Sequence, residues 1–151
     1  MTYATRADIE TLYGPAELRL ALDLGRDDTL SADNLASIDR AIEEASARID
    51  AYLVGRYALP LTTTPPVLRG YAVDIALYTL ASRQGRPRDE LRKRFEDALA
   101  FLKSVSKGDA KLPGVPDTAT GPLTPGDTGA GGGVSSVGGG RRIRRDTEIL
   151  S

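Results

Sequence analysis

The sequence predicts an all-α fold: a small bundle of about five helices, two short and three longer, followed by a long Gly/Pro-rich C-terminal extension. Apolar residues recur at spacings of three and four, which is the period of one helix face. Aromatic residues make up only 5% of the chain and Trp is absent, so the core must consist mainly of Leu, Ile, Val and Ala. Gly and Pro mark the ends of the periodic segments. A chain of 151 residues suits one domain.

Two short helices are predicted near the N-terminus. Thr5 followed by Asp8 resembles a capping box with Asp in place of Glu, so the first helix begins after Thr5. Gly14 ends this helix. Pro15 suits the first position of the second helix, which we expect to end near Leu22.

The third helix has the clearest apolar pattern in the chain. Ser31 or Asp33 caps its start, Gly55 weakens its last turn and Pro60 ends it. The face opposite the apolar stripe is charged, as expected of a surface that meets solvent or another subunit. The stripe consists of Leu35, Ile38, Ile42, Ala45, Ile49 and Tyr52.

Two more helices follow a proline-rich loop. The fourth runs from Val67 to about Arg83 and is apolar around most of its circumference, which predicts burial between neighbours. The fifth opens at Pro87 and closes at Gly108. Its apolar stripe consists of Leu91, Phe95, Ala98, Leu99, Leu102 and Val105.

Composition divides the chain into three parts. Residues 1–108 hold all the predicted helices, and residues 109–140 are rich in Pro, Gly, Thr and Ser, so we expect a flexible linker. Residues 141–151, RRIRRDTEILS, regain charge and apolar character and are predicted to form a docking arm. The arm can add to a partner's sheet edge while its arginines pair with acidic groups, although a tail with no binding role is the alternative. The arm residues expected to make contact are Arg141, Arg142, Ile143, Arg144, Arg145, Thr147, Ile149 and Leu150.

The sequence offers little for catalysis. It contains no His and no Cys, which removes the usual general base, the commonest metal ligand and thiol chemistry. Glu43 and Glu44 are neighbours in a helix and point about 100 degrees apart, so they do not converge on one ligand. We therefore expect no enzyme activity, no cofactor and no bound metal. Asp74 needs a polar partner in the apolar fourth helix, and the expected partner is an arginine. The candidates are Arg48, Arg56 and Arg69.

Charge is unevenly distributed along the chain. Residues 1–82 carry 7 basic and 12 acidic side chains, and residues 83–151 carry 13 and 9, so the two parts are near −5 and +4. Such a pattern suits head-to-tail self-association. It also leaves an alternative function, a small helical nucleic-acid-binding module that uses the arginines of residues 86–94 and of the arm. No apolar run is long enough for a transmembrane helix and no signal layout is present, so we expect a soluble protein that does not contact a membrane.

Four stretches together resemble the Mu-like phage family of small head-tail connector, or adaptor, proteins. They are YATRADIETLYG, AIEEASARIDAYLVGRYALPL, PPVLRGYAVDIALYTL and FEDALAFLKSVSKGDAKL, and the likeness covers residues 3–112. The most specific piece is the combination of ID-Y-L, RY-LPL and a nearby PP-VL. The resemblance does not extend to the glycine-rich linker or the arm, so their role is not inherited from it.

The resemblance implies an all-helical subunit of a ring, commonly of twelve copies, at the neck of the virion. Such a ring docks on the portal protein, joins the capsid to the tail and continues the DNA channel. The implied partners are other copies of this chain, the portal, and a tail-terminator or other neck protein. DNA would pass through the channel without sequence-specific binding. The subunit would be made in the host cytoplasm.

Two further sets of residues are expected to serve assembly. In a head-to-tail ring, we expect the acidic face of the third helix to meet basic residues of a neighbour's fifth helix. This subunit interface consists of Asp39, Glu43, Glu44, Arg88, Arg92 and Arg94. By resemblance, a helix-loop junction is shaped by Tyr52, Arg56, Tyr57, Pro60, Pro65 and Pro66.

Overall fold

The computed structural model of the chain describes residues 1–25 and 29–118. The remainder of the predicted linker and the whole predicted docking arm, residues 119–140 and 141–151, lie outside the described residues.

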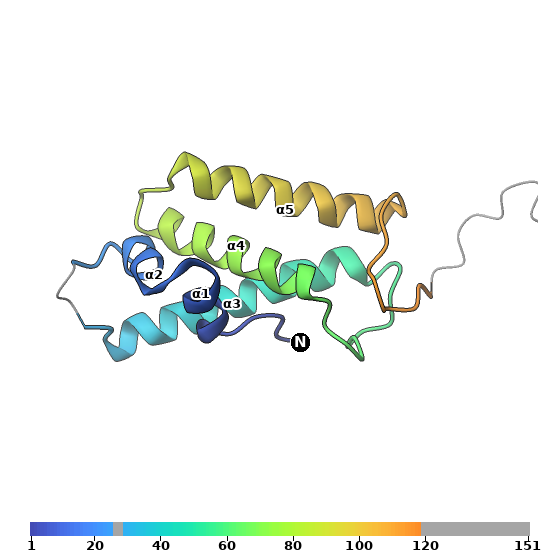
Figure 1. Ribbon diagram of the computed structural model, residues 1–151, viewed down its shortest axis with the longest axis horizontal. Helices are drawn as coiled ribbons and strands as arrows, with labels where there is room; N and C mark the ends of the chain where they lie inside the picture. The colour runs from blue at the N-terminus through green and yellow to red at the C-terminus, as the bar shows by residue number, and fades with distance from the viewer. Residues whose placement is uncertain (26–28, 119–151) are drawn as a thin grey trace, which may run out of the picture. The chain divides into compact units, whose positions relative to one another are not determined.

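Five helices and no strands form the described part of the chain, which confirms the all-α prediction. Their order and lengths match two short helices followed by three longer ones (Figure 1). Ser31, rather than Asp33, caps the third helix. The fifth helix starts two residues after Pro87, because Arg88 takes the N-cap position. The helices are α1 (Arg6–Tyr13), α2 (Pro15–Ala21), α3 (Ala32–Leu53), α4 (Pro66–Arg83) and α5 (Asp89–Lys107).

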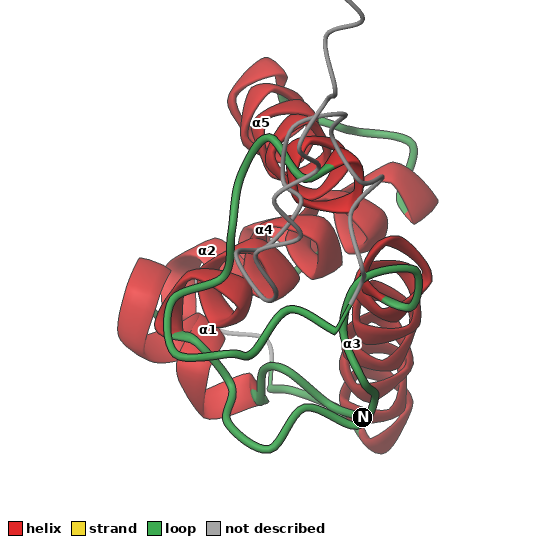
Figure 2. Cartoon of the chain, turned by 90° about the vertical axis from the view of Figure 1, so that its right-hand side faces the viewer, coloured by secondary structure: helices red, strands yellow, loops and turns green. Residues whose placement is uncertain are grey.

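Helix α4 lies at the centre of the arrangement. It packs between α3 and α5, and the short helices α1 and α2 also pack on it (Figures 1 and 2). Residues 72–77 are all buried, so this helix is enclosed on every side over nearly two turns. This confirms the burial that its sequence predicted.

The apolar stripe of α3 supplies much of the core beside α4. Ile38, Ala45, Ile49 and Leu53 are fully buried at 0% exposure, and Ile42 is almost so. Complete burial of a Leu or Ile side chain stabilises a protein by about 1.5–3 kcal/mol. The predicted spacing of three and four therefore identified the inward face of this helix correctly.

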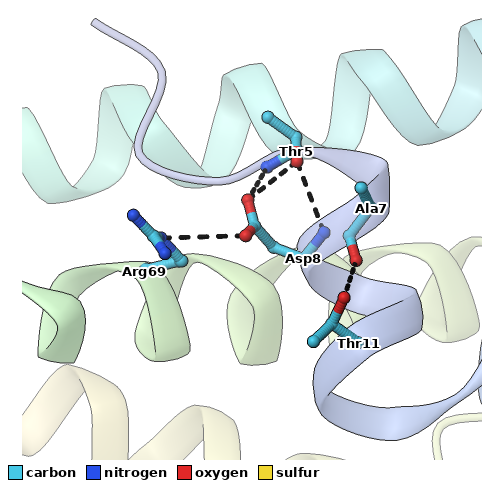
Figure 3. Close-up of polar contacts among 5 residues, drawn as sticks. All are labelled: Thr5, Ala7, Asp8, Thr11 and Arg69. Atoms are coloured by element: carbon cyan, nitrogen blue, oxygen red, sulfur yellow. Dashed lines mark hydrogen bonds and ion pairs between the residues drawn. The ribbon is translucent and has the colours of Figure 1, made fainter.

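Reciprocal hydrogen bonds between Thr5 and Asp8 fix the start of α1 (Figure 3). The Thr5 backbone N–H donates to Asp8 Oδ2 at 2.8 Å, and the Asp8 N–H donates to Thr5 Oγ1 at 3.3 Å. The Thr5 hydroxyl also donates to Asp8 Oδ2 at 2.8 Å. This bond first, and then the bond from the Thr5 backbone N–H and the charge of Arg69, hold the pKa of Asp8 below its ordinary value. Arg69 of α4 approaches Asp8 Oδ1 to 3.8 Å, so the cap also connects α1 to the central helix.

None of the five described helices combines the length and the apolar character needed to cross a lipid bilayer.

Replacing Thr5 with Ala should lower the free energy of unfolding by about 1 kcal/mol, because the cap of α1 is lost. Urea denaturation followed by far-UV circular dichroism measures the change. Thr11→Ala is the matched control, since Thr11 is exposed within α1 and its hydroxyl bonds only to the Ala7 carbonyl of the same helix. Equal stability losses in the two variants would contradict a capping role.

Candidate assembly interface

The junction between α3 and α4 is anchored to the core by two apolar side chains. Tyr57 and Leu61 are 3% and 5% exposed, so their side chains hold the loop against the bundle. The peptide bond between Leu59 and Pro60 is cis. Pro65 occupies the N-cap position of α4 and Pro66 its first turn.

The predicted junction residues differ in burial. Tyr52 is half-buried against the core, and Pro60 and Pro66 are exposed. Pro65 is buried and Arg56 is half-buried. The polar tip of the loop, Thr62 and Thr63, faces solvent. Any contact with another molecule at this loop would therefore involve its tip and not the aromatic side chains of the junction.

Residues 109–118, here called the strap, return from the end of α5 to this junction (Figure 1). The Leu112 N–H donates to the Tyr57 hydroxyl at 3.1 Å, and Leu112 itself is buried. The Thr118 N–H and hydroxyl both donate to the Arg56 carbonyl, at 2.9 and 3.1 Å. The Arg56 guanidinium forms an ion pair with Asp117. The chain thus stays packed on the helices as far as Thr118, ten residues beyond the predicted end of the helical region at Gly108.

Sequence reasoning missed the strap because its composition is that of a linker. The available signal was the apolar pair Leu112 and Val115, spaced among prolines in the run KLPGVPD. Leu112 is buried and Val115 packs against the core. Two apolar residues are enough to fasten the segment because Tyr57 and Arg56 also supply hydrogen bonds.

Gly108 allows the close approach that the strap requires. Its φ of +91° is left-handed, and a Cβ placed there would lie 2.3 Å from Nη1 of Arg56. The guanidinium of Arg56 therefore occupies the space that a side chain at position 108 would need. Its Nε is buried without a hydrogen-bond partner in the described part of the chain, so Asp117 is the main polar contact of this group.

On α3, the predicted acidic interface residues lie in two different surroundings. Asp39 and Glu43 are exposed and line a groove of about 270 Å³ against the N-terminal segment, with Ile42 between them. Glu44 instead forms an ion pair with Arg83 of α4. The first two carboxylates therefore remain available on the surface, whereas Glu44 already has a partner within the chain.

The basic residues predicted on α5 mostly face their own bundle. Arg88 pairs with Glu17 of α2. Arg94 pairs with Glu90 and lies over the Tyr13 ring, with Cζ 4.5 Å from the ring centroid. Arg92 is exposed. Within the described chain no ion pair joins these arginines to the acidic residues of α3, and contact between copies stays a prediction.

A buried polar cluster surrounds Asp74. The Tyr13 hydroxyl donates to Asp74 Oδ1 at 2.6 Å. Burial raises the pKa of Asp74, the Tyr13 hydrogen bond and the charge of Arg94 oppose that rise, and Asp97 adds to it. Burial and the nearby Asp74 also raise the pKa of Tyr13 to about 12. The cluster links α1, α4 and α5, and it gives the buried carboxylate of Asp74 a hydrogen-bond donor.

The prediction that Arg48, Arg56 or Arg69 would pair with Asp74 is wrong. A tyrosine from α1 reaches the carboxylate first, because α1 packs directly on α4. The expected arginines have other contacts: Arg48 with Phe95, Arg56 with Asp117 and Arg69 with Asp8.

A further surface feature, not predicted, lies where α3, α4 and α5 meet. Arg48 Cζ is 5.4 Å from the centroid of the Phe95 ring, and Phe95 stacks on Tyr78 at 4.4 Å between centroids. These residues line a groove of about 310 Å³ together with Thr79, Ser82 and Arg83. Periodicity placed Phe95 in the apolar stripe of α5 but could not show that an arginine from α3 would lie against it.

A third groove, of about 410 Å³, lies along α2 and is almost entirely apolar. Pro15, Ala16 and Leu24 line it beside Leu20, which is 54% exposed. No group of three potential metal-ligating side chains occurs among residues 1–25 and 29–118.

These features define a small helical module whose described grooves lie on its outer surface. A family model described as "Bacteriophage Mu, Gp36" matches residues 3–129. The chain is 43% identical over 77 residues to "Mu-like prophage FluMu protein gp36" of Haemophilus influenzae. This match covers 51% of this chain and 53% of that protein. The chain is also 31% identical over 115 residues to "Gene product J" of Escherichia phage Mu. This match covers 76% of this chain and 78% of that protein.

The chain belongs to the phage Mu Gp36 family. The resemblance to Mu-like phage proteins is confirmed at this level. The matched region spans about half the length of the prophage protein and a larger share of the phage Mu protein.

Gly108→Ala should destabilise the chain more than Gly114→Ala. Both positions have left-handed backbones, so both variants lose about 1–2 kcal/mol to steric strain. A Cβ at Gly114 meets open space, whereas one at Gly108 displaces the Arg56 guanidinium from Asp117. Urea denaturation compares the two variants, and amide exchange at Thr118 reports loosening of the strap. Equal losses of stability in the two variants, with equal amide protection at Thr118, would contradict a stabilising role for the contact between Arg56 and Asp117.

The free energy of unfolding of the Asp74→Asn variant should rise relative to that of the wild type as pH rises from acid to neutral. Because burial raises the pKa of Asp74, the folded chain binds this proton more tightly than the unfolded chain. Stability from this group therefore falls as pH rises from the ordinary carboxyl pKa through the raised value. Asn keeps an acceptor for Tyr13 but does not ionise. Denaturation across this pH range tests the trend against the exposed control Asp109→Asn, and a constant difference from wild type would contradict it.

Proposed function

We propose that this protein is a structural subunit of the phage particle, a head-tail connector that forms a ring at the neck. The ring docks on the portal protein, joins the capsid to the tail and continues the DNA channel. Membership of the phage Mu family supports the phage context. The subunit is made in the host cytoplasm and ends in the virion, between capsid and tail.

The structural observation that carries the proposal is the attachment of the strap to the α3–α4 junction. Contacts with Arg56 and Tyr57 hold residues 109–118, so the chain continues from a fixed point at Thr118. A subunit that must send a terminal arm to another protein needs such a fixed origin, because the arm's reach is then set by the length of chain that follows. The buried α4 supplies a rigid support for that origin.

The length of the remaining chain suits contact with a neighbouring protein. If residues 119–140 form the linker that their Gly-rich composition predicts, a chain of that kind and length would span about 25 Å. The arm, residues 141–151, adds up to about 36 Å when extended. We propose that the arm docks on the portal or on a tail-terminator or other neck protein, where its arginines meet acidic groups and its apolar residues add to a sheet edge.

The described bundle also suits repeated copies in a ring. A ring is built from heterologous contacts, in which one face of each subunit meets a different face of the next. We propose a ring of twelve copies, with DNA passing through the channel without sequence-specific contacts. The exposed tip of the α3–α4 loop, Thr62 and Thr63, is then available to a neighbour or to the channel.

The alternative is a small nucleic-acid-binding module that uses the arginine clusters. The ion pairs of Arg86, Arg88 and Arg94 with carboxylates of the same chain disfavour this alternative. Arginines that already have intramolecular partners contribute less to the phosphate contacts on which such binding depends.

Deleting residues 138–151 should abolish attachment to the portal and leave the helical fold intact. The measurement is co-sedimentation of the full-length and truncated chains with purified portal complex, with circular dichroism as the check on folding. A chain whose last fourteen residues are shuffled in order is the matched control, and we expect it to fail as well. Undiminished attachment of the truncated chain would refute the docking role.

Two further outcomes decide between the candidate functions. Ring-shaped particles of the full-length chain in negative-stain images are expected from a connector. A salt-dependent shift of duplex DNA in a gel at physiological ionic strength is expected from a nucleic-acid-binding module. A chain that shifts DNA and stays monomeric would replace the connector proposal with the alternative.

A further inference from the structure

Helix α3 carries opposite charges on opposite sides. Asp39 and Glu43 are one turn apart and define one edge of the helix. Arg48 follows Asp39 by nine residues, which is two and a half turns, so it projects from the other side. Each side opens onto a groove, one lined by Asp39, Ile42 and Glu43 and the other by Arg48.

The groove beside Arg48, here called the Arg48 groove, is well suited to receive a carboxylate. The guanidinium lies on the Phe95 ring, which is itself stacked on Tyr78. Stacking orients the planar group while leaving its N–H donors free to bind an acid in a forked geometry. No carboxylate of the described chain forms an ion pair with Arg48, whereas the other arginine of the groove, Arg83, is paired with Glu44.

The acidic edge offers the complementary chemistry. Asp39 and Glu43 are both exposed, and neither has an ion-pair partner among the described residues. Ile42 lies between them but is only 3% exposed, so the surface of this edge is formed mainly by the two carboxylates. The guanidinium of the Arg48 groove is complementary to these acidic groups.

We propose that the Arg48 groove of one copy receives the Asp39 and Glu43 edge of the next copy. The inference rests on the proposed ring and identifies its subunit contact. Arg48 takes the receiving role that the sequence predicts for Arg88, Arg92 and Arg94. Two of these arginines, Arg88 and Arg94, already bind Glu17 and Glu90 of their own chain.

The placement of the two faces determines the kind of assembly. A dimer with two-fold symmetry uses the same patch on both copies. Here the complementary patches lie on different sides of α3, so each contact leaves one acidic edge and one Arg48 groove unoccupied. Further copies can therefore add head to tail, and in the proposed ring the last copy contacts the first.

Charge reversal on the full-length chain tests the proposal. Arg48→Glu alone, and the double variant Asp39→Arg with Glu43→Arg alone, should each lose the ring. Each should elute as the 16.1 kDa single chain in size-exclusion chromatography with light-scattering detection. The reversed positions are exposed, so both variants should keep the helical circular dichroism spectrum. Lys103→Glu, an equal charge change at an exposed site on α5, is the matched control and should leave the ring intact.

Mixing the two reversed variants in equal amounts should restore rings of alternating copies. In the mixture, the unaltered acidic edge meets an unaltered Arg48 groove, and the reversed edge meets the reversed groove, so both contacts are again attractive. A ring that survives Arg48→Glu, or a mixture that fails to assemble, would overturn the contact while leaving the connector function standing. A wild-type chain that never assembles would overturn both.

Discussion

The burial of α4 is the constraint on which the rest of the structure depends. This helix has almost no solvent-facing side over residues 72–77, so α1, α2, α3 and α5 must all pack around it. Once they do, each of these four helices keeps an outward face, and the charged faces of α3 and α5 lie among them. Asp74 is accommodated in this apolar environment because Tyr13 reaches it from α1. The surfaces available for assembly are thus set by what the core requires.

The same packing explains why the strap matters. Helices α3 and α4 are joined by a loop whose anchor, Tyr57, is buried and uses its hydroxyl to hold Leu112. Arg56 beside it binds Asp117 and Thr118, and Gly108 leaves room for its guanidinium. A segment of linker-like composition is thereby fastened to the rigid part of the molecule. The connector function proposed here relies on that fixed point, since everything beyond Thr118 starts from it.

Sequence reasoning located the helices and the caps well, because these depend on neighbours a few residues apart. Thr5 with Asp8, Ser31 and the apolar stripe of α3 were all visible in the sequence. Contacts between helices were harder to predict. The bond from Tyr13 to Asp74 joins positions 61 residues apart, and Arg48 meets Phe95 only because α3 and α5 lie close together. No local pattern encodes such pairs, so the grooves required the structure.

A connector ring at the neck of a phage particle should be visible in a cryo-electron microscopy reconstruction of the neck of intact virions. We expect repeated helical density, fitted by α3, α4 and α5, in a closed ring between the portal and the tail. A neck reconstruction without this bundle, or the bundle found at another place in the particle, would show that this chain is not the connector.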